Sequence, residues 1–294
     1  MIINLSLILT IMIWKKLPLY ILMASFLVLN IYAQHIAFRL DLLMIPLLFL
    51  QFFILKKNNL KLILKIIFTL IFLIIGILIH EVYFLIASFP LFYILYFKLG
   101  RNRWMYCTVV FLPSLVVFLL MVILFKGNVS SADNIILSWE RLGVNPKHLS
   151  YLRWLFSLKG PIYIIYNVAF VKNKFYLVGF LLNYILVCLC FYLYIKQCFF
   201  VNKRNTIFIL GNFSMILILC CIATDFVRWY YMVFLVILFY FVLFEKRKSF
   251  FINKKYLILK IFVLFLGLPM YGWTFTHFYW TSPIKYIIEL KKYF

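Results

Sequence analysis

His80 and Glu81 are adjacent in an otherwise apolar run, IIGILIHEVYFLI, which extends from Ile74 to Ile86. An imidazole and a carboxylate can transfer protons, and ionisable groups inside an apolar run usually face a cavity or a partner. The pair therefore indicates either a general base or acid, or a charge that only holds helices together. Both interpretations stay open at this point.

Two further segments carry residues suited to bind an anion or a sugar. In QHIAFRLD, His35 and Arg39 are four positions apart, and in TDFVRWYY, Asp225, Arg228 and Trp229 have the spacing of one helical face. The planar guanidinium group of arginine binds two phosphate oxygens at once, and a tryptophan ring can stack on a sugar. Asp225 and Arg228 could equally form a structural salt bridge, and Trp229 could anchor a helix at a membrane interface.

Residues 126–173 are the one sizeable stretch without a continuous apolar run. Its segment SSADNIILSWERLG predicts a short amphipathic helix, capped by Ser130 or Ser131, with Trp139 on its apolar face and Gly143 at its end. A second amphipathic segment, LSYLRWLFSLKG, follows. The basic residues of this loop are Arg141, Lys147, Arg153 and Lys159. They suit capture of an anionic ligand or contact with anionic lipid headgroups, and both remain open.

The composition predicts the kind of secondary structure that positions these candidate residues. Hydrophobic residues make up 67% of the 294 positions and charged residues 13%, whereas a soluble domain is nearer half apolar and a quarter charged. We therefore predict an all-α fold, a polytopic bundle of membrane-spanning helices that forms one integral domain over residues 1–294. We expect no cleaved signal peptide, because the first run lacks a basic start and a small-residue cleavage site, and the natural chain could begin upstream.

Short basic clusters recur between the apolar runs, as they do in the cytoplasmic loops of membrane proteins. They are Lys15–Lys16, Lys56–Lys65, Lys98–Arg103, Lys196–Arg204 and Lys246–Lys260. Placing all five inside predicts ten spans, near residues 1–14, 17–34, 40–55, 64–79, 82–97, 104–125, 174–195, 206–224, 229–244 and 257–275. Residues 126–173 then form a long extracytoplasmic loop, and both termini lie outside. An additional span at 149–171 is the alternative, which its own basic residues and the charge bias disfavour.

This topology predicts that all four histidines and six of the seven acidic residues lie on the outer side, with only Glu245 inside. Between Lys65 and Lys98 the chain must cross twice within 32 residues. Each arm is then about 24 Å long, shorter than the hydrocarbon core of about 30 Å. We therefore expect the turn with His80 and Glu81 to lie below the outer headgroups.

Several classes of function are disfavoured. The basic residues do not share one face, which argues against nucleic acid as a partner. The six cysteines have no metal-ligand spacing and indicate no disulfide framework; they are Cys107, Cys188, Cys190, Cys198, Cys220 and Cys221. The chain has no Walker A, dinucleotide-binding, HExxH or GxSxG motif, so we expect no cofactor and no metal.

The order of GILIHEVYFLIASFP, then LFKGNVSSADNIILSWERLG in a large loop, then TDFVRWYYMVF resembles one group of membrane proteins. These are the Wzy-type and EpsG-like polymerases of bacterial O-antigen, capsule and exopolysaccharide repeat units, and the likeness spans roughly residues 35–245. It implies metal-independent glycosyl transfer at the outer face of the bacterial inner membrane. The growing glycan, held on undecaprenyl diphosphate, would pass to the terminal sugar of a lipid-linked repeat unit. Membrane lipid, a chain-length regulator and a flippase are the further partners that such a system implies.

The resemblance suggests a role for each candidate residue. A base is needed for the acceptor hydroxyl, and Glu81 or His80 would serve, with Asp225 in reserve. Positive charge must stabilise the departing diphosphate, and the candidates are Arg39, Arg228, Arg141 and Arg153. Trp229 and Trp139 are the candidates for stacking on a sugar.

Three other functions remain alternatives. A polyprenyl-phosphate-dependent membrane glycosyltransferase would transfer one sugar and need an acidic residue in the first outer loop, for which Asp41 is the candidate. A glycan O-acyltransferase would need His35 or His80 as its base and a donor path from the cytoplasm. A non-catalytic polysaccharide transporter or flippase would use the same charges to line a passage.

Overall fold

The computed structural model describes residues 41–98, 103–124, 129–141, 143, 174–222, 226–246, 268–271 and 278–281. Most of these residues are helical. The helices are α3 (Asp41–Lys56), α4 (Leu62–Ile79), α5 (Val82–Lys98), α6 (Arg103–Leu124), α7 (Val129–Arg141), α10 (Lys174–Cys198), α11 (Lys203–Ile222) and α12 (Phe226–Phe244). Two short strands, β1 (Leu268–Tyr271) and β2 (Phe278–Thr281), pair antiparallel.

Seven predicted spans coincide with helices, α3 to α6 and α10 to α12, with boundaries that differ by a few residues. Two of these helices, α4 and α6, are long and apolar enough to cross a membrane, by length and composition. In an apolar stretch of 18 residues, only 33% of the residues of α4 and 17% of those of α6 are buried. Most of their apolar side chains therefore face outward, which is atypical of a core helix in a soluble protein. The predicted spans 1–14 and 17–34 lie outside the described residues.

The prediction of the spans is wrong in one stretch of the described residues. Residues 268–271 belong to the predicted helix 257–275, but they form strand β1, in which Pro269 is opposite Trp280 of β2. Proline by itself does not explain the strand, because α3, α5 and α6 each contain one. The segment FYWT of β2 is rich in residues that favour strands, and β1 pairs with it. The described fold is therefore helical apart from this two-stranded pair.

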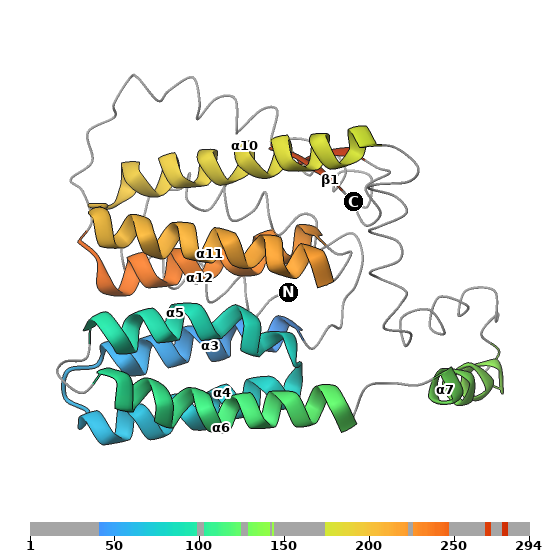
Figure 1. The fold of residues 1–294 in the computed structure, drawn as a ribbon, viewed down its shortest axis with the longest axis horizontal. Coiled ribbons are helices and arrows are strands. Elements are labelled where there is room, and N and C mark those ends of the chain that lie inside the picture. The colour runs from blue at the N-terminus through green and yellow to red at the C-terminus, as the bar shows by residue number, and fades with distance from the viewer. Residues whose placement is uncertain are drawn as a thin grey trace, which may run out of the picture.

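The helices form two groups that pack against each other (Figure 1). The first group is α3 to α6 and the second is α10 to α12, and α11 and α12 of the second group contact α3 and α5 of the first. Helix α12 is buried from Met232 to Leu243, as expected of a helix that is hydrophobic on all sides. Aromatic rings fill the interface, for example Phe49 with Phe239, whose centroids are 5.1 Å apart.

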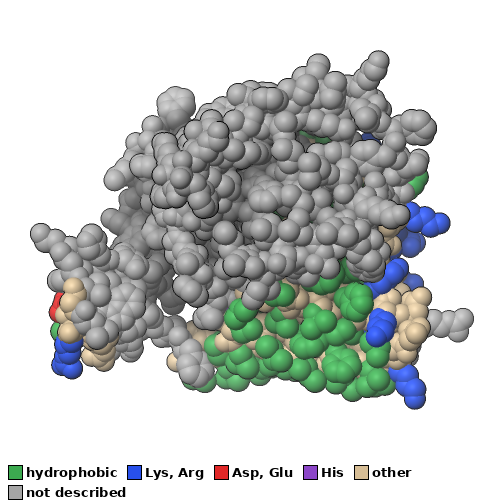
Figure 2. Space-filling view, turned by 180° about the vertical axis from the view of Figure 1, so that it is seen from behind, with side chains coloured by type: hydrophobic (Ala, Val, Ile, Leu, Met, Phe, Trp, Pro, Cys, Tyr) green, Lys and Arg blue, Asp and Glu red, His purple; other side chains and the backbone are tan. Residues whose placement is uncertain are grey.

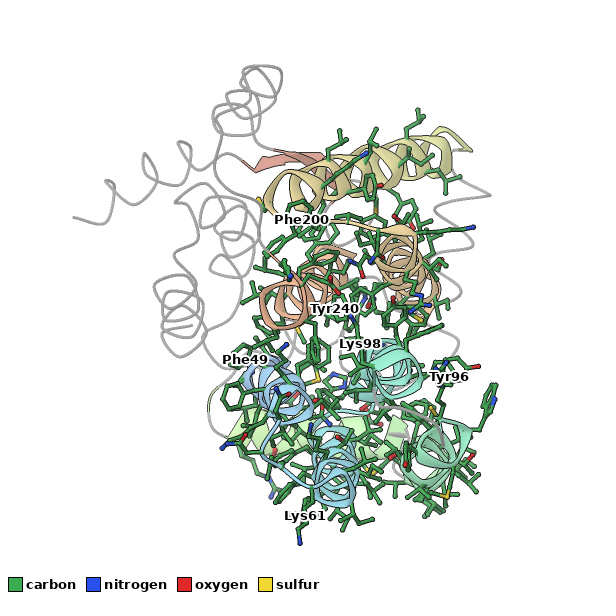
Figure 3. The ribbon with its side chains drawn as sticks, turned by 90° about the vertical axis from the view of Figure 1, so that its left-hand side faces the viewer. Phe49, Lys61, Tyr96, Lys98, Phe200 and Tyr240 are labelled. Atoms are coloured by element: carbon green, nitrogen blue, oxygen red, sulfur yellow. The ribbon has the colours of Figure 1, made fainter. Side chains whose placement is uncertain are left out.

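Successive helices of the bundle run in opposite directions, so the described parts of four basic clusters meet at one end of it, while Lys15–Lys16 lies outside the described residues. We call this the basic end; it comprises the α3–α4 turn, the end of α5, the start of α6, the α10–α11 turn and the end of α12. Nζ of Lys98 is 3.0 Å from Oε1 of Glu245, and the N–H of Phe200 donates to the carbonyl of Lys246. Figure 3 views the bundle from this end. The meeting of these clusters agrees with the prediction that they share one side, whereas the side of the membrane on which they lie stays a prediction.

Helix α7 is the predicted amphipathic helix of the loop 126–173, and in Figure 1 it lies apart from the helical bundle. It begins at Val129, so Ser130 and Ser131 lie in its first turn instead of capping it. Gly143 follows its end with a φ of +82°, and its N–H donates to the carbonyl of Glu140. The predicted end at a glycine is therefore confirmed, because positive φ suits glycine best. The second amphipathic segment and the alternative span 149–171 lie outside the described residues.

Candidate functional site

The turn that carries His80 and Glu81 joins α4 to α5 at the end opposite the basic end. His80 has an extended backbone, with φ −162° and ψ 124°, which stops α4. Its N–H still donates to the carbonyl of Gly76, at 3.0 Å. The carbonyls of His80 and Glu81 accept from Tyr83 and Phe84 and so open the first turn of α5. Backbone bonds on both sides therefore fix the position of the turn.

The side chains of this turn form one close pair. Nδ1 of His80 is 3.2 Å from Oε2 of Glu81, and the exposed fractions of the two side chains are 24% and 50%. The N–H of Val82 also donates to Nδ1, at 3.3 Å. One nitrogen cannot accept from Val82 and donate to Glu81 at the same time. The contact with Glu81 is therefore a hydrogen bond only when Nδ1 carries a proton.

A buried polar chain below the turn holds the α4–α5 hairpin in place. The hydroxyl of Tyr83 donates to Oε1 of Gln51 in α3. The amide of Gln51 donates in turn to the carbonyl of Thr69 in α4, at 3.1 Å, and the hydroxyl of Thr69 donates to the carbonyl of Lys65. This chain ties three helices together, and all of its bonds lie away from solvent, where they are strong.

Gly76 makes room for this arrangement. A Cβ atom at position 76 would be 2.1 Å from Cδ1 of Tyr83, far inside van der Waals contact. Sequence reasoning missed Gln51, Tyr83 and Gly76 as the residues that support the turn. The signals were present, since Gln51 is a polar residue in an apolar run and Gly76 is the one glycine of α4.

The other predicted site residues are placed less completely. Trp229 lies in the first turn of α12 and is 1% exposed, so a sugar can stack on it only after neighbouring side chains move. Arg228 is also in α12, and Arg141 is exposed at the end of α7. The side chains of Arg228 and Trp139 lie outside the described part, as do the whole of Arg39, Arg153, Asp225 and His35. Of the predicted residues, the described structure brings His80 and Glu81 together.

The described residues bring no three His, Cys, Asp or Glu side chains together as metal ligands. Cys107, Cys188 and Cys198 are buried, as expected for small core residues. Within the described ranges, proton transfer by the pair of His80 and Glu81 is the chemistry that the arrangement offers.

Comparison with models of protein families, with curated proteins and with solved structures finds no match for this chain.

Proposed function

We propose that this chain polymerises lipid-linked oligosaccharide repeat units of a bacterial surface polysaccharide, by glycosyl transfer at the outer face of the inner membrane. One observation carries the proposal: His80 and Glu81 are 3.2 Å apart at the bundle end opposite the basic end. Basic loops stay in the cytoplasm. A proton-transfer pair at the opposite end is what an enzyme that works at the outer leaflet needs.

In the proposed step, Glu81 takes the proton of an acceptor sugar's hydroxyl, and that oxygen attacks the anomeric carbon of the growing glycan. A glycosidic bond forms while the bond between the anomeric carbon and the diphosphate oxygen breaks. Undecaprenyl diphosphate leaves with the electron pair, and arginine side chains stabilise its charge. We assign this stabilisation to Arg39 and Arg228, with Arg141 and Arg153 from the loop. His80 either holds the carboxylate of Glu81 or replaces it as the base.

Transfer of a single sugar from a polyprenyl phosphate is the second candidate, and one observation favours it. Helix α3 ends at Lys56, whose Nζ lies 5.6 Å from the ring centre of Phe244 at the basic end. Asp41, the first residue of α3, is therefore at the same end as Glu81. An acidic residue at that position is what this second reaction requires.

Transport without catalysis receives less support from the described helices. Buried polar side chains do occur inside them, among them Gln51, Thr69, Ser114 and Asn212. Each donates a hydrogen bond to a backbone carbonyl within the bundle. Three of these bonds lie within one helix and that of Gln51 joins α3 to α4, so the bundle itself satisfies these groups.

Deletion of the gene, followed by electrophoresis of the cell's glycolipids, separates these functions. Loss of a polymerase leaves single repeat units where a ladder of lengths stood. Loss of a flippase leaves no repeat units on the surface, and loss of a single-sugar transferase shortens or alters each unit. An unchanged ladder would reject the proposal.

The residue assignment is tested with Glu81→Gln and Arg228→Ala, which we expect to abolish chain extension while the protein still reaches the membrane. Glu140→Gln is the matched control, because Glu140 is an exposed carboxylate on α7 with no assigned role. Asp41→Asn should leave the ladder intact if the chain is a polymerase and should stop transfer in the second candidate. Normal ladders from both Glu81→Gln and Arg228→Ala would reject the site.

A further inference from the structure

Helices α4 and α6 expose bulky apolar side chains along their whole length. We call these residues the acyl face; in α4 they are Ile63, Leu64, Ile67, Phe68, Ile71, Ile75 and Leu78, and in α6 they are Trp104, Met105, Val109, Leu112, Leu115, Val116, Leu119, Leu120, Val122, Ile123 and Leu124. The two helices pack side by side and both start at the basic end. Water does not favour so large an apolar surface, so another apolar phase must cover it.

The composition of the acyl face favours lipid over a second protein. Interfaces between membrane helices use small residues, which let the backbones approach closely, whereas this face consists mostly of large aliphatic and aromatic side chains. Thr108 is exposed beside these residues in α6, and its hydroxyl donates within the helix to the carbonyl of Trp104, at 2.9 Å. Apart from the indole N–H of Trp104, the side chains of the acyl face offer no polar group to a partner.

Exposed cations border the acyl face at the basic end. Lys57 and Lys61 lie in the α3–α4 turn, and Arg103 is the first residue of α6. Figure 2 shows Lys and Arg side chains gathered at one edge of the hydrophobic surface, and in Figure 3 Lys61 points away from the bundle. We call Lys57, Lys61 and Arg103 the headgroup patch. Next to it, Trp104 is 67% exposed, as is common for tryptophan at the headgroup level of a membrane.

Other cations of the basic end are engaged with the protein itself. Lys98 pairs with Glu245, and the ammonium group of Lys65 is buried and donates to the carbonyl of Leu55, at 3.2 Å. Lys56 lies over the ring of Phe244. Arg103 likewise lies over the ring of Tyr96, 5.6 Å from its centre. The headgroup patch is therefore set apart by its position beside the acyl face, not by a lack of contacts.

We propose that the headgroup patch and the acyl face together bind an anionic phospholipid. Its phosphate contacts Lys57, Lys61 and Arg103, and its acyl chains lie along α4 and α6. Clusters of lysine and arginine beside membrane helices attract anionic lipids, by about 1 kcal/mol for each cation. Burial of the chains adds a hydrophobic contribution that a free phosphate ion lacks.

The test uses the full-length protein in detergent and measures retained lipid by native mass spectrometry. Phosphatidylglycerol and phosphatidylcholine with identical chains are added in turn, and so are dihexanoyl phosphatidylglycerol and inorganic phosphate. We expect long-chain phosphatidylglycerol to be retained, with little retention of the other lipids and no displacement by phosphate. The variant with Lys57→Gln, Lys61→Gln and Arg103→Gln should bind phosphatidylglycerol about a hundredfold more weakly.

The matched control carries Lys203→Gln, Arg204→Gln and Lys246→Gln, three exposed cations of the same end that border α11 and α12. It should lose less than about threefold in affinity if each cation acts locally. Equal losses in the two triple variants would show general attraction and overturn the proposal. Equal retention of phosphatidylcholine, displacement by inorganic phosphate, or a disulfide-linked dimer of Ile71→Cys would also overturn it.

If the triple variant does not fold, Lys61→Gln alone replaces it, because Lys61 is exposed and precedes α4. Melting temperatures without added lipid verify that the variants fold. The readout here is lipid retention, whereas the proposed polymerase function is read from the glycolipid ladder. Lipid binding can therefore fail while the ladder still depends on Glu81, and lipid can bind while the ladder does not depend on Glu81.

Discussion

At the scale of single residues, Nδ1 of His80 lies between two neighbours that require opposite proton states. The N–H of Val82 needs a lone pair on this nitrogen, whereas Oε2 of Glu81 needs a proton on it. Nδ1 can therefore satisfy the backbone N–H or the carboxylate, but not both at once.

Gly76 supplies the clearest prediction for one residue. We expect Gly76→Ala to destabilise the protein by about 1–3 kcal/mol, the usual effect of overpacking a core. The added Cβ would be 2.1 Å from the ring of Tyr83, and this ring is buried and held by its bond to Gln51. The measurement is thermal unfolding in detergent, followed by size-exclusion chromatography.

Ile75→Ala is the control for this prediction. Ile75 is the neighbouring residue of α4 and is 40% exposed, so its truncation leaves no cavity in the bundle and should change the melting temperature little. Equal melting temperatures for Gly76→Ala and the wild-type protein would show that Tyr83 can move at no cost, and the account of the α4–α5 hairpin would be wrong.

At the scale of elements, the two helical groups are joined by polar contacts at the basic end. Oε1 of Glu245, just after α12, accepts from Nζ of Lys98 at the end of α5 and from the hydroxyl of Tyr240 at 2.9 Å. The same hydroxyl is 3.3 Å from Oδ1 of Asn205 in α11, which is its alternative acceptor. Figure 3 shows Lys98 and Tyr240 between the helices. This cluster connects α5, α11 and α12, so it sets how the first group sits against the second.

Exchange of the two charges tests this connection. Lys98→Met leaves the carboxylate of Glu245, whose side chain is 12% exposed, without its cation. We expect it to destabilise the protein by about 1–3 kcal/mol, because a mostly buried charge loses its partner. The double variant Lys98→Glu with Glu245→Lys should recover at least half of this loss. Melting temperatures of the purified proteins measure both effects.

Lys203→Met is the control, since Lys203 is an exposed lysine at the same end of the bundle. It should leave the melting temperature near that of the wild-type protein. If Lys203→Met and Lys98→Met have the same effect, the pair with Glu245 does not connect the two groups of helices.

At the scale of the whole molecule, the bundle has two chemically different ends. The basic end collects the described lysine and arginine clusters, while the turn with His80 and Glu81 lies at the other end. Helix α4 separates Lys61 from His80 by 18 residues, which is about 27 Å. If the bundle crosses a membrane, these two positions must lie on opposite sides of it.

Labelling of single introduced cysteines with a membrane-impermeant maleimide checks this orientation in intact cells. We expect Glu81→Cys to react from outside and Lys61→Cys to react only after the cells are permeabilised. Cys107, Cys188 and Cys198 are buried, which limits the background from these thiols. The reverse pattern would invert the topology and remove the proposed chemistry from the outer face. Reaction of both from outside would show that α4 does not cross.

The apolar runs and the basic clusters by themselves determined where most helices lie. In a run such as Leu62–Ile79, a helix pairs the backbone N–H and C=O groups with one another inside the segment. The charged residues on either side mark where the helix ends. The position of His80 and Glu81 in a turn follows from the same local pattern. The strand β1 was missed because its pairing with β2 is a contact between two segments, and hydrophobicity alone does not reveal it.

The tertiary structure alone decided which residues support the turn and which join the two groups of helices. The bond from Tyr83 to Gln51 and the pair of Lys98 with Glu245 link positions 32 and 147 residues apart. Nothing local in the sequence relates such positions, because the packing of the whole bundle brings them together. The burial of Trp229 and the exposure of one face of α4 and α6 also depend on which helices become neighbours. Hydrophobicity alone does not reveal this, because helices that end up buried and helices that end up exposed have similarly apolar sequences.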